Sequence, residues 1–170
     1  MSSSNLQFGP SIRYGLIAGT IAIVINILLL QLGSVLGLHT GHGGLLKFLV
    51  TVTHLGPIQW DRAPLNMLPA PFWKITFHFV VGLGMAVFYV IFLEPKLRRV
   101  FTPLVSGLFY ALALWLVNAW VILPVLGMGI AGEAAIPLSG MIYFAFAHTV
   151  FFVILAILYA KFSHRSMPSN

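Results

Sequence analysis

Four polar side chains lie within otherwise apolar stretches of the sequence, and their types decide what chemistry they can support. They are Asn26, His78, Asn118 and His148. An amide offers two donors and an acceptor, and a neutral imidazole offers one of each, so these groups can satisfy one another by hydrogen bonding. Such bonds between membrane helices contribute about 0.6 to 2 kcal/mol each and fix helix register. The residue types therefore predict a shared polar layer.

The two histidines of this layer also suit haem chemistry. Imidazoles at matched depth on two helices are the axial ligands that a b-type haem requires. Four nearby phenylalanines could line the faces of the group: Phe77, Phe79, Phe151 and Phe152. No basic cluster for the haem propionates is evident near that depth. We therefore expect no cofactor and keep haem b, held by His78 and His148, as the alternative.

A second group of histidines suggests a metal site. His39 and His42 form a His-Thr-Gly-His sequence, and His54 follows in the same inter-helix segment. Three imidazoles on one side of a membrane can hold a copper or zinc ion. Few carboxylates are near them, because only Asp61 and Glu133 are candidates. The alternative is that these histidines are polar residues at the level of the lipid headgroups.

The amino-acid composition indicates whether these residues lie in a soluble protein or in a membrane protein. The chain has 170 residues, of which 59% are hydrophobic and 7% are charged, and its mean hydropathy is +1.00. Soluble domains carry about 25% charged residues, so a soluble globular enzyme is excluded. The net charge of +6 would suggest nucleic acid in a soluble domain, but here the basic residues stand at the ends of apolar runs, where anionic headgroups lie. We expect the lipid bilayer as a partner, and no nucleic acid.

The charged residues divide the chain into four apolar intervals, each long enough for one membrane span of about 20 residues. The sequence predicts spans at about 13–37, 72–93, 100–126 and 137–161, within a single transmembrane domain over residues 1–170. A shorter apolar segment at about 45–55 ends at Gly56-Pro57 and is typical of an interfacial helix. The expected fold is an all-α integral membrane bundle of four transmembrane helices with an interfacial helix in the first outer loop.

The two halves of the sequence share a pattern that predicts an internal repeat. The first and third spans match at an offset of 92 residues, and the second and fourth match at an offset of 70 residues. The matched pairs are Gly15 with Gly107, Asn26 with Asn118, His78 with His148, and Tyr89 with Tyr159. Two hairpins that each cross the membrane twice would be related by a pseudo-two-fold axis along the membrane normal. Eleven residues separate Gly from Asn and His from Tyr, which is about 16 Å of helix, so all four polar residues are expected at one depth.

Basic residues also predict the orientation. Arg13 precedes the first span, the turn between the second and third spans contains Lys96, Arg98 and Arg99, and Lys161 lies at the end of the fourth. Lys and Arg are enriched in cytoplasmic segments. The loop between the first and second spans also carries Lys47, Arg62 and Lys74, which argues against this side, but it is the longest loop and weighs less. We therefore expect both termini in the cytoplasm.

Motifs of known enzymes are missing from the sequence. It has no P-loop, Gly-x-Ser-x-Gly or His-Glu-x-x-His motif, and its three Asp and Glu residues leave little scope for acid–base pairs. The sequence favours a non-catalytic accessory or scaffold subunit of a membrane complex, with other membrane subunits or a second copy of itself as partner. The alternatives are a b-haem electron-transfer protein and a transporter of a small neutral solute or lipid.

Three short motifs resemble those of a bacterial family. They are His78-Phe79-x-x-Gly82, Leu123-Pro124-x-x-Gly127-x-Gly129, and Ala147-His148 followed by Tyr159. On these motifs the chain resembles the YagU-like four-span group of small inner-membrane proteins, over about half its length. It departs from the family pattern at Phe152, where a glycine is expected. The resemblance implies a bacterial cytoplasmic membrane location and no particular activity.

Overall fold

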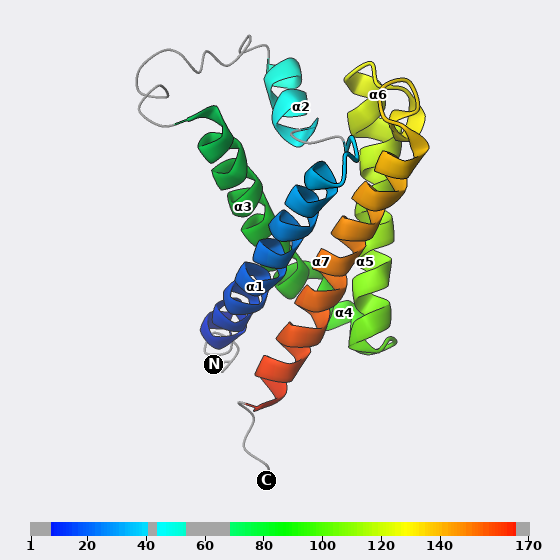
Figure 1. The fold of residues 1–170 in the computed structure, drawn as a ribbon. Helices are drawn as coiled ribbons and strands as arrows, with labels where there is room; N and C mark the ends of the chain where they lie inside the picture. The colour runs from blue at the N-terminus through cyan, green and yellow to red at the C-terminus, as the bar shows by residue number, and fades with distance from the viewer. Residues whose placement is uncertain (1–7, 41–43, 54–68, 166–170) are drawn as a thin grey trace.

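The computed structural model describes residues 8–40, 44–53 and 69–165, and this part of the chain is helical with no strands. Five helices carry most of it. They are α1 (Phe8–Val35), α2 (Gly44–Thr53), α3 (Ala70–Phe88), α5 (Pro103–Val117) and α7 (Leu138–Arg165). Figure 1 shows the start of α1 and the end of α7 at one end of the molecule and α2 at the other. We call these the terminal end and the α2 end.

Two of the long helices contain a π-helical turn. Tyr89–Leu93 (η3) joins α3 to the short α4 (Glu94–Leu97), and Asn118–Ile122 (η4) joins α5 to α6 (Leu123–Val125). Each π turn ends two residues before a proline, Pro95 or Pro124. Proline has no N–H to donate, and its ring clashes with the carbonyl four residues earlier, so a widened turn before it accommodates both effects. A 3₁₀ turn, η5 (Ile130–Gly132), then leads toward α7.

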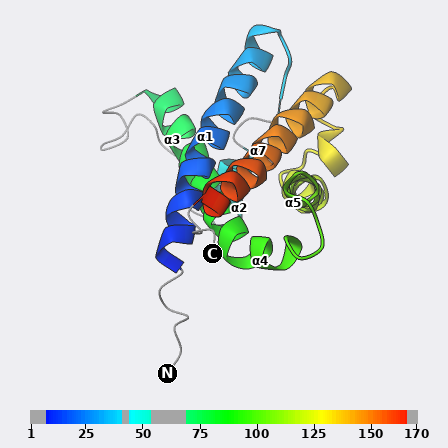
Figure 2. The same cartoon turned by 90° about the horizontal axis from the view of Figure 1, so that it is seen from below.

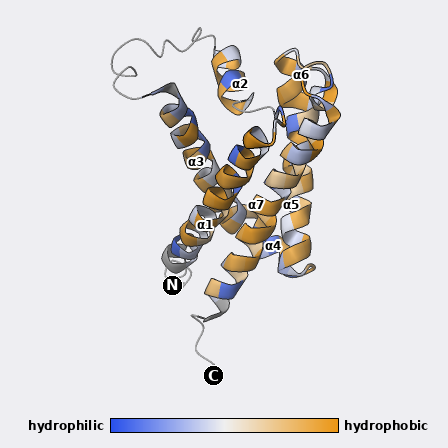
Figure 3. Ribbon diagram, viewed as in Figure 1, coloured by the Kyte–Doolittle hydropathy of each residue, from blue (hydrophilic) through white to orange (hydrophobic). Residues whose placement is uncertain are grey.

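Four helical segments are long and apolar enough to cross a membrane. They are Ser11–Val35, Pro71–Leu97, Pro103–Val125 and Leu138–Ser163. Figure 3 shows hydrophobic residues along all four of them. The prediction of a multi-pass, all-helical membrane bundle is confirmed at this level. A helix also forms at Gly44–Thr53, where the interfacial segment was expected, and its position at a membrane interface stays a prediction.

The long helices pack in the order α3, α1, α7, α5 (Figures 1 and 2). Small residues permit the close contacts: a Cβ on Gly107 would lie 2.7 Å from the Cα of Val153, so α5 and α7 touch backbone to backbone. Gly19 of α1 similarly faces Ala86 of α3. Small residues let membrane helices approach closely, and they set these two pairings.

Aromatic rings join the helices at the terminal end. The ring of Tyr110 stacks on that of Tyr89 at a centroid distance of 5.6 Å, and the Tyr110 hydroxyl donates to the carbonyl of Met85 at 3.1 Å. Tyr89 also meets Tyr159 of α7 edge to face, at 6.5 Å. Toward the α2 end, α3 and α5 diverge, and α2 lies between them (Figure 1). The bundle is therefore packed at one end and open between α3 and α5 at the other.

Candidate functional site

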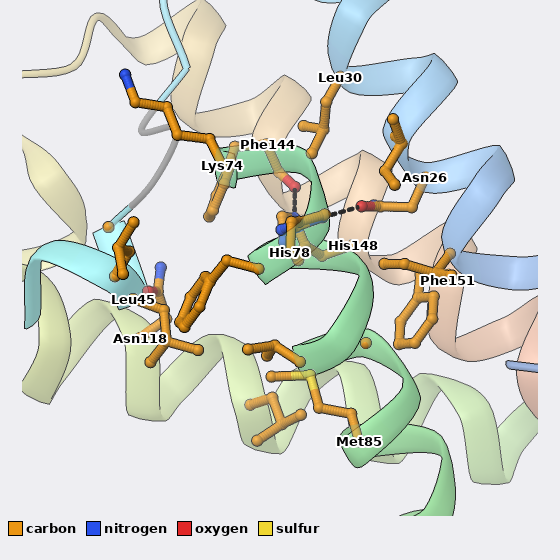
Figure 4. Close-up of a pocket in the computed structure, with 18 of the residues that line it drawn as sticks. Asn26, Leu30, Leu45, Lys74, His78, Met85, Asn118, Phe144, His148 and Phe151 are labelled. Carbon is orange, nitrogen blue, oxygen red and sulfur yellow. Dashed lines mark hydrogen bonds between the residues drawn. The ribbon is translucent and has the colours of Figure 1, made fainter. Parts of the chain in front are cut away.

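Asn26 is the centre of a buried hydrogen-bond network. Its side chain is 1% exposed, and its amide Nδ2 donates to the carbonyl of Ala147 at 2.8 Å. Its Oδ1 lies 2.8 Å from Nε2 of His78, which must be the donor because an amide oxygen only accepts. Asn26 thus joins α1 to both α3 and α7 (Figure 4).

His148 lies beside this pair. Its Nδ1 donates to the carbonyl of Phe144 at 2.9 Å, one turn earlier in α7. Its ring is 6.1 Å from that of His78 with the planes nearly perpendicular, and it also packs against the ring of Phe144 at 4.2 Å. The structure therefore brings three of the four predicted polar residues together.

Asn118 stands apart from these three. It begins the π turn η4 and lies near Leu45 of α2, across the pocket from His78 (Figure 4). Within the described part of the chain, its half-buried amide has no hydrogen-bond partner. The predicted polar layer is thus split into a bonded group of three and one amide that faces the pocket.

The pocket occupies the opening between α3 and α5. Its volume is about 400 Å³, and its walls come from α1, α3, α5, η4 and α7, with the start of α2 at one end. Most of its lining is aliphatic or aromatic. Its polar lining includes Asn118 and both histidines, and Lys74 is the one charged residue that lines it among the described residues. Pockets of this size and character are typical of small-molecule sites.

Two lining residues were missed in the sequence. From the sequence, neither Lys74 nor Trp115 is assigned to a site, yet both line the pocket. Lys74 precedes His78 by four residues, which places both on one face of a helix. That spacing was a usable signal for Lys74, whereas nothing in the sequence distinguished Trp115 from other aromatic residues.

The structure describes only part of the predicted metal site. His39 is exposed in the short segment that follows α1 and lines a second pocket of about 120 Å³ together with Lys47. His42 and His54 lie outside the described residues. Among residues 8–40, 44–53 and 69–165, no group of three His, Asp or Glu side chains could hold a metal ion. The three-histidine site stays a prediction.

Haem ligation by the two central histidines would require a rearrangement. The obstacle is at His78, whose Nε2 donates to Asn26. His148 donates Nδ1–H to a carbonyl of its own helix, as metal-bound histidines commonly do with their second ring nitrogen. An axial ligand needs a ring nitrogen with its lone pair toward the iron. The Asn26–His78 bond would have to break before Nε2 of His78 could serve, so this arrangement suits a hydrogen-bond network better than a haem site.

Comparisons with known proteins give no relative for this chain. No family model, no curated protein and no solved structure matches it. The resemblance to the YagU-like group therefore stays a prediction. The case for function comes from the geometry of the pocket and its polar residues.

Proposed function

We propose that this protein is a non-catalytic membrane protein that binds a lipid-like molecule in the pocket between α3 and α5. The observation that carries the proposal is the pocket itself, about 400 Å³ in volume, mostly apolar, and located within membrane-spanning helices. A water-filled cavity with such walls is unfavourable inside a bilayer, and an acyl chain suits them better.

This proposal develops two functions predicted from the sequence. From the alternative of a transporter of a small neutral solute or lipid, it keeps the lipid as ligand but not the transport. From the accessory-subunit role, it keeps a subunit that holds a bound amphiphile beside its partner. The b-haem alternative has less support, because Nε2 of His78 already donates to Asn26. On the basis of the family resemblance, we propose that the protein lies in the bacterial inner membrane. On the basis of the distribution of Lys and Arg, we propose that both termini are in the cytoplasm.

We further propose that the two hairpins are pseudo-two-fold copies. Two of the matched pairs contact each other, His78 with His148 at 6.1 Å and Tyr89 with Tyr159 at 6.5 Å. Equivalent residues meet in this way when they lie beside a two-fold axis. In such a repeat, Asn118 is the equivalent of Asn26. The side chain of Asn26 makes hydrogen bonds within the bundle, whereas Asn118, which lines the pocket, makes no equivalent bonds among the described residues. The opening between α3 and α5 is thus the place where the two hairpins depart from two-fold symmetry.

Tryptophan fluorescence can test the binding proposal. Trp115 lines the pocket, whereas Trp120 is 64% exposed on the outside of the same crossing. Two single-tryptophan proteins, one that keeps Trp115 and one that keeps Trp120, are placed in nanodiscs and titrated with dibromostearate, whose bromines quench tryptophan on contact. We expect saturable quenching of Trp115 at low probe content. Quenching of Trp120 should rise only in proportion to the bulk probe.

A blocked pocket provides the control. Val81→Phe combined with Leu114→Phe adds bulk to two half-buried lining positions on opposite walls. In this variant the saturable quenching of Trp115 should disappear while the helical circular dichroism spectrum stays unchanged. Parallel, unsaturable quenching of Trp115 and Trp120 in the parent protein would overturn the proposal.

A further inference from the structure

The pocket changes character along its length. On α3 the lining residues Lys74, His78 and Met85 succeed one another from the α2 end inward. Lys74 and, one turn deeper, His78 bring the charge and the imidazole, and the lining of α3 beyond His78 is apolar, with Val81, Gly82 and Met85. An amphiphile with a polar head and an apolar tail has the same order of groups.

The part of the pocket inward of Lys74 is about as long as one leaflet of a bilayer is thick. Eleven residues separate Lys74 from Met85, or about 16 Å of helix at 1.5 Å per residue. The hydrocarbon core of a bilayer is about 30 Å thick, so a single leaflet contributes about 15 Å. A volume of about 400 Å³ is also near the lower end of the range for small-molecule pockets. One chain fits these dimensions better than two.

The mouth of the pocket is positive. Lys74 is exposed, and no carboxylate of the described residues pairs with it. It also lies near the first turn of α3, whose dipole places partial positive charge at the same level. A cation at the edge of a bilayer is stabilised by an anionic partner, so the head of a bound amphiphile should be an anion.

The amide of Asn118 provides a second polar contact. It faces the pocket without a hydrogen-bond partner among the described residues and is half-buried in a membrane-spanning segment. An amide can both donate and accept. It can therefore hold a carbonyl or hydroxyl on the ligand, or an uncharged part of its head.

From these observations, and resting on the proposed function, we propose that the pocket selects a single-chain amphiphile with an anionic head, whose charge is bound by Lys74. A long-chain carboxylate and a monoacyl phosphate share this chemistry. Two-chain lipids and neutral single-chain lipids are disfavoured, the first by size and the second by the unmatched charge at the mouth.

The test compares ligands that differ in one feature, with Trp115 as the reporter. Dibromostearate, the equivalent dibromostearyl alcohol, a dibrominated monoacyl phosphate and a dibrominated two-chain phosphatidic acid are titrated at alkaline pH, where the carboxylate is ionised. We expect the carboxylate, the monoacyl phosphate or both to bind at least about tenfold more tightly than the alcohol. The two-chain lipid should bind more weakly than the better single-chain anion.

Substitutions of Lys74 test whether this residue causes the preference for an anionic head. Lys74→Gln should weaken binding of the anion by about tenfold while leaving the alcohol unchanged, and Lys74→Arg should retain the preference. The control is Lys47→Gln, because Lys47 lines the smaller pocket and does not line this one. It should change neither affinity.

The outcomes separate this inference from the proposed function. Equal binding of anion and alcohol, tighter binding of the two-chain lipid, or equal effects of Lys74→Gln and Lys47→Gln would overturn the charge and chain selectivity while saturable binding persists. Absence of saturable quenching with all four probes would instead overturn the proposed function.

Discussion

At the scale of single residues, Asn26 and Asn118 show how position decides the role of a side chain. Both are amides within apolar helices, at matched positions of the predicted repeat. Both line the pocket, but Asn26 is buried and its amide is bonded to His78 and Ala147, whereas the amide of Asn118 has no hydrogen-bond partner among the described residues. We infer that the first amide stabilises the bundle and the second serves the pocket.

Replacing each amide with leucine should therefore give unequal results. Asn26→Leu removes the acceptor of His78 Nε2–H and the donor to the Ala147 carbonyl, and should lower the free energy of unfolding by about 1 to 3 kcal/mol. Asn118→Leu should change it by less than about 0.5 kcal/mol, because no bond within the bundle is lost. The measurement is unfolding in mixed detergent micelles followed by circular dichroism. Equal losses in the two variants would contradict this division of roles.

At the scale of helices, glycine contacts and proline-induced turns set the geometry of the pocket. Gly107 lets α5 lie directly against the backbone of α7, which holds one wall in place. The π turn that precedes Pro124 begins at Asn118, so this amide lines the pocket at the point where the helix widens. A regular α-helix through these residues would direct later side chains differently.

Replacing each of two glycines with alanine should show which of them is needed for close helix packing. Gly107→Ala places a methyl group 2.7 Å from the Cα of Val153, a backbone atom that cannot move aside. We expect a loss of about 1 to 3 kcal/mol in unfolding free energy. Gly84→Ala is the control, because nothing lies within 4 Å of its Cβ position; it should be neutral or stabilising by up to about 1 kcal/mol. The same detergent titration measures both, and a stable Gly107→Ala variant would show that α5 and α7 are not packed so closely.

At the scale of the whole molecule, the four spans form a bundle that is closed at the terminal end and open between α3 and α5 at the α2 end (Figure 1). The tyrosines at the terminal end join η3, α5 and α7. Above them, Asn26 joins α1, α3 and α7 and leaves α5 out of the network. The tyrosine contacts therefore close the opening at the terminal end, and the Asn26 network closes it on the side of α1 and α7.

Orientation is tested by labelling introduced cysteines, which is simple because the chain has none of its own. Leu36 is 62% exposed at the α2 end, and Val100 is 74% exposed in the turn between α4 and α5. If both termini are cytoplasmic, a membrane-impermeant maleimide should label Leu36→Cys in intact cells. Val100→Cys should react only after the membrane is permeabilised. The reverse pattern would place the termini outside.

The sequence alone determined the class of protein and its spans. Long apolar intervals bounded by charges predict membrane helices because the bilayer demands about 20 apolar residues per crossing, whatever the packing. The same logic identified Asn26, His78, Asn118 and His148, since a polar residue in such an interval stands out against its neighbours.

Only the tertiary structure decided which of these residues meet and where the pocket lies. Apolar helices in lipid gain little specificity from hydrophobicity, so their pairing depends on the fit of small residues such as Gly107 and on individual hydrogen bonds. That fit joins α1 to α7 and leaves α3 and α5 apart at the α2 end, whereas Tyr110 of α5 still bonds to Met85 of α3 at the terminal end. It also places Lys74 and Trp115 on the pocket wall, because a pocket is a property of the space between helices and not of any one segment.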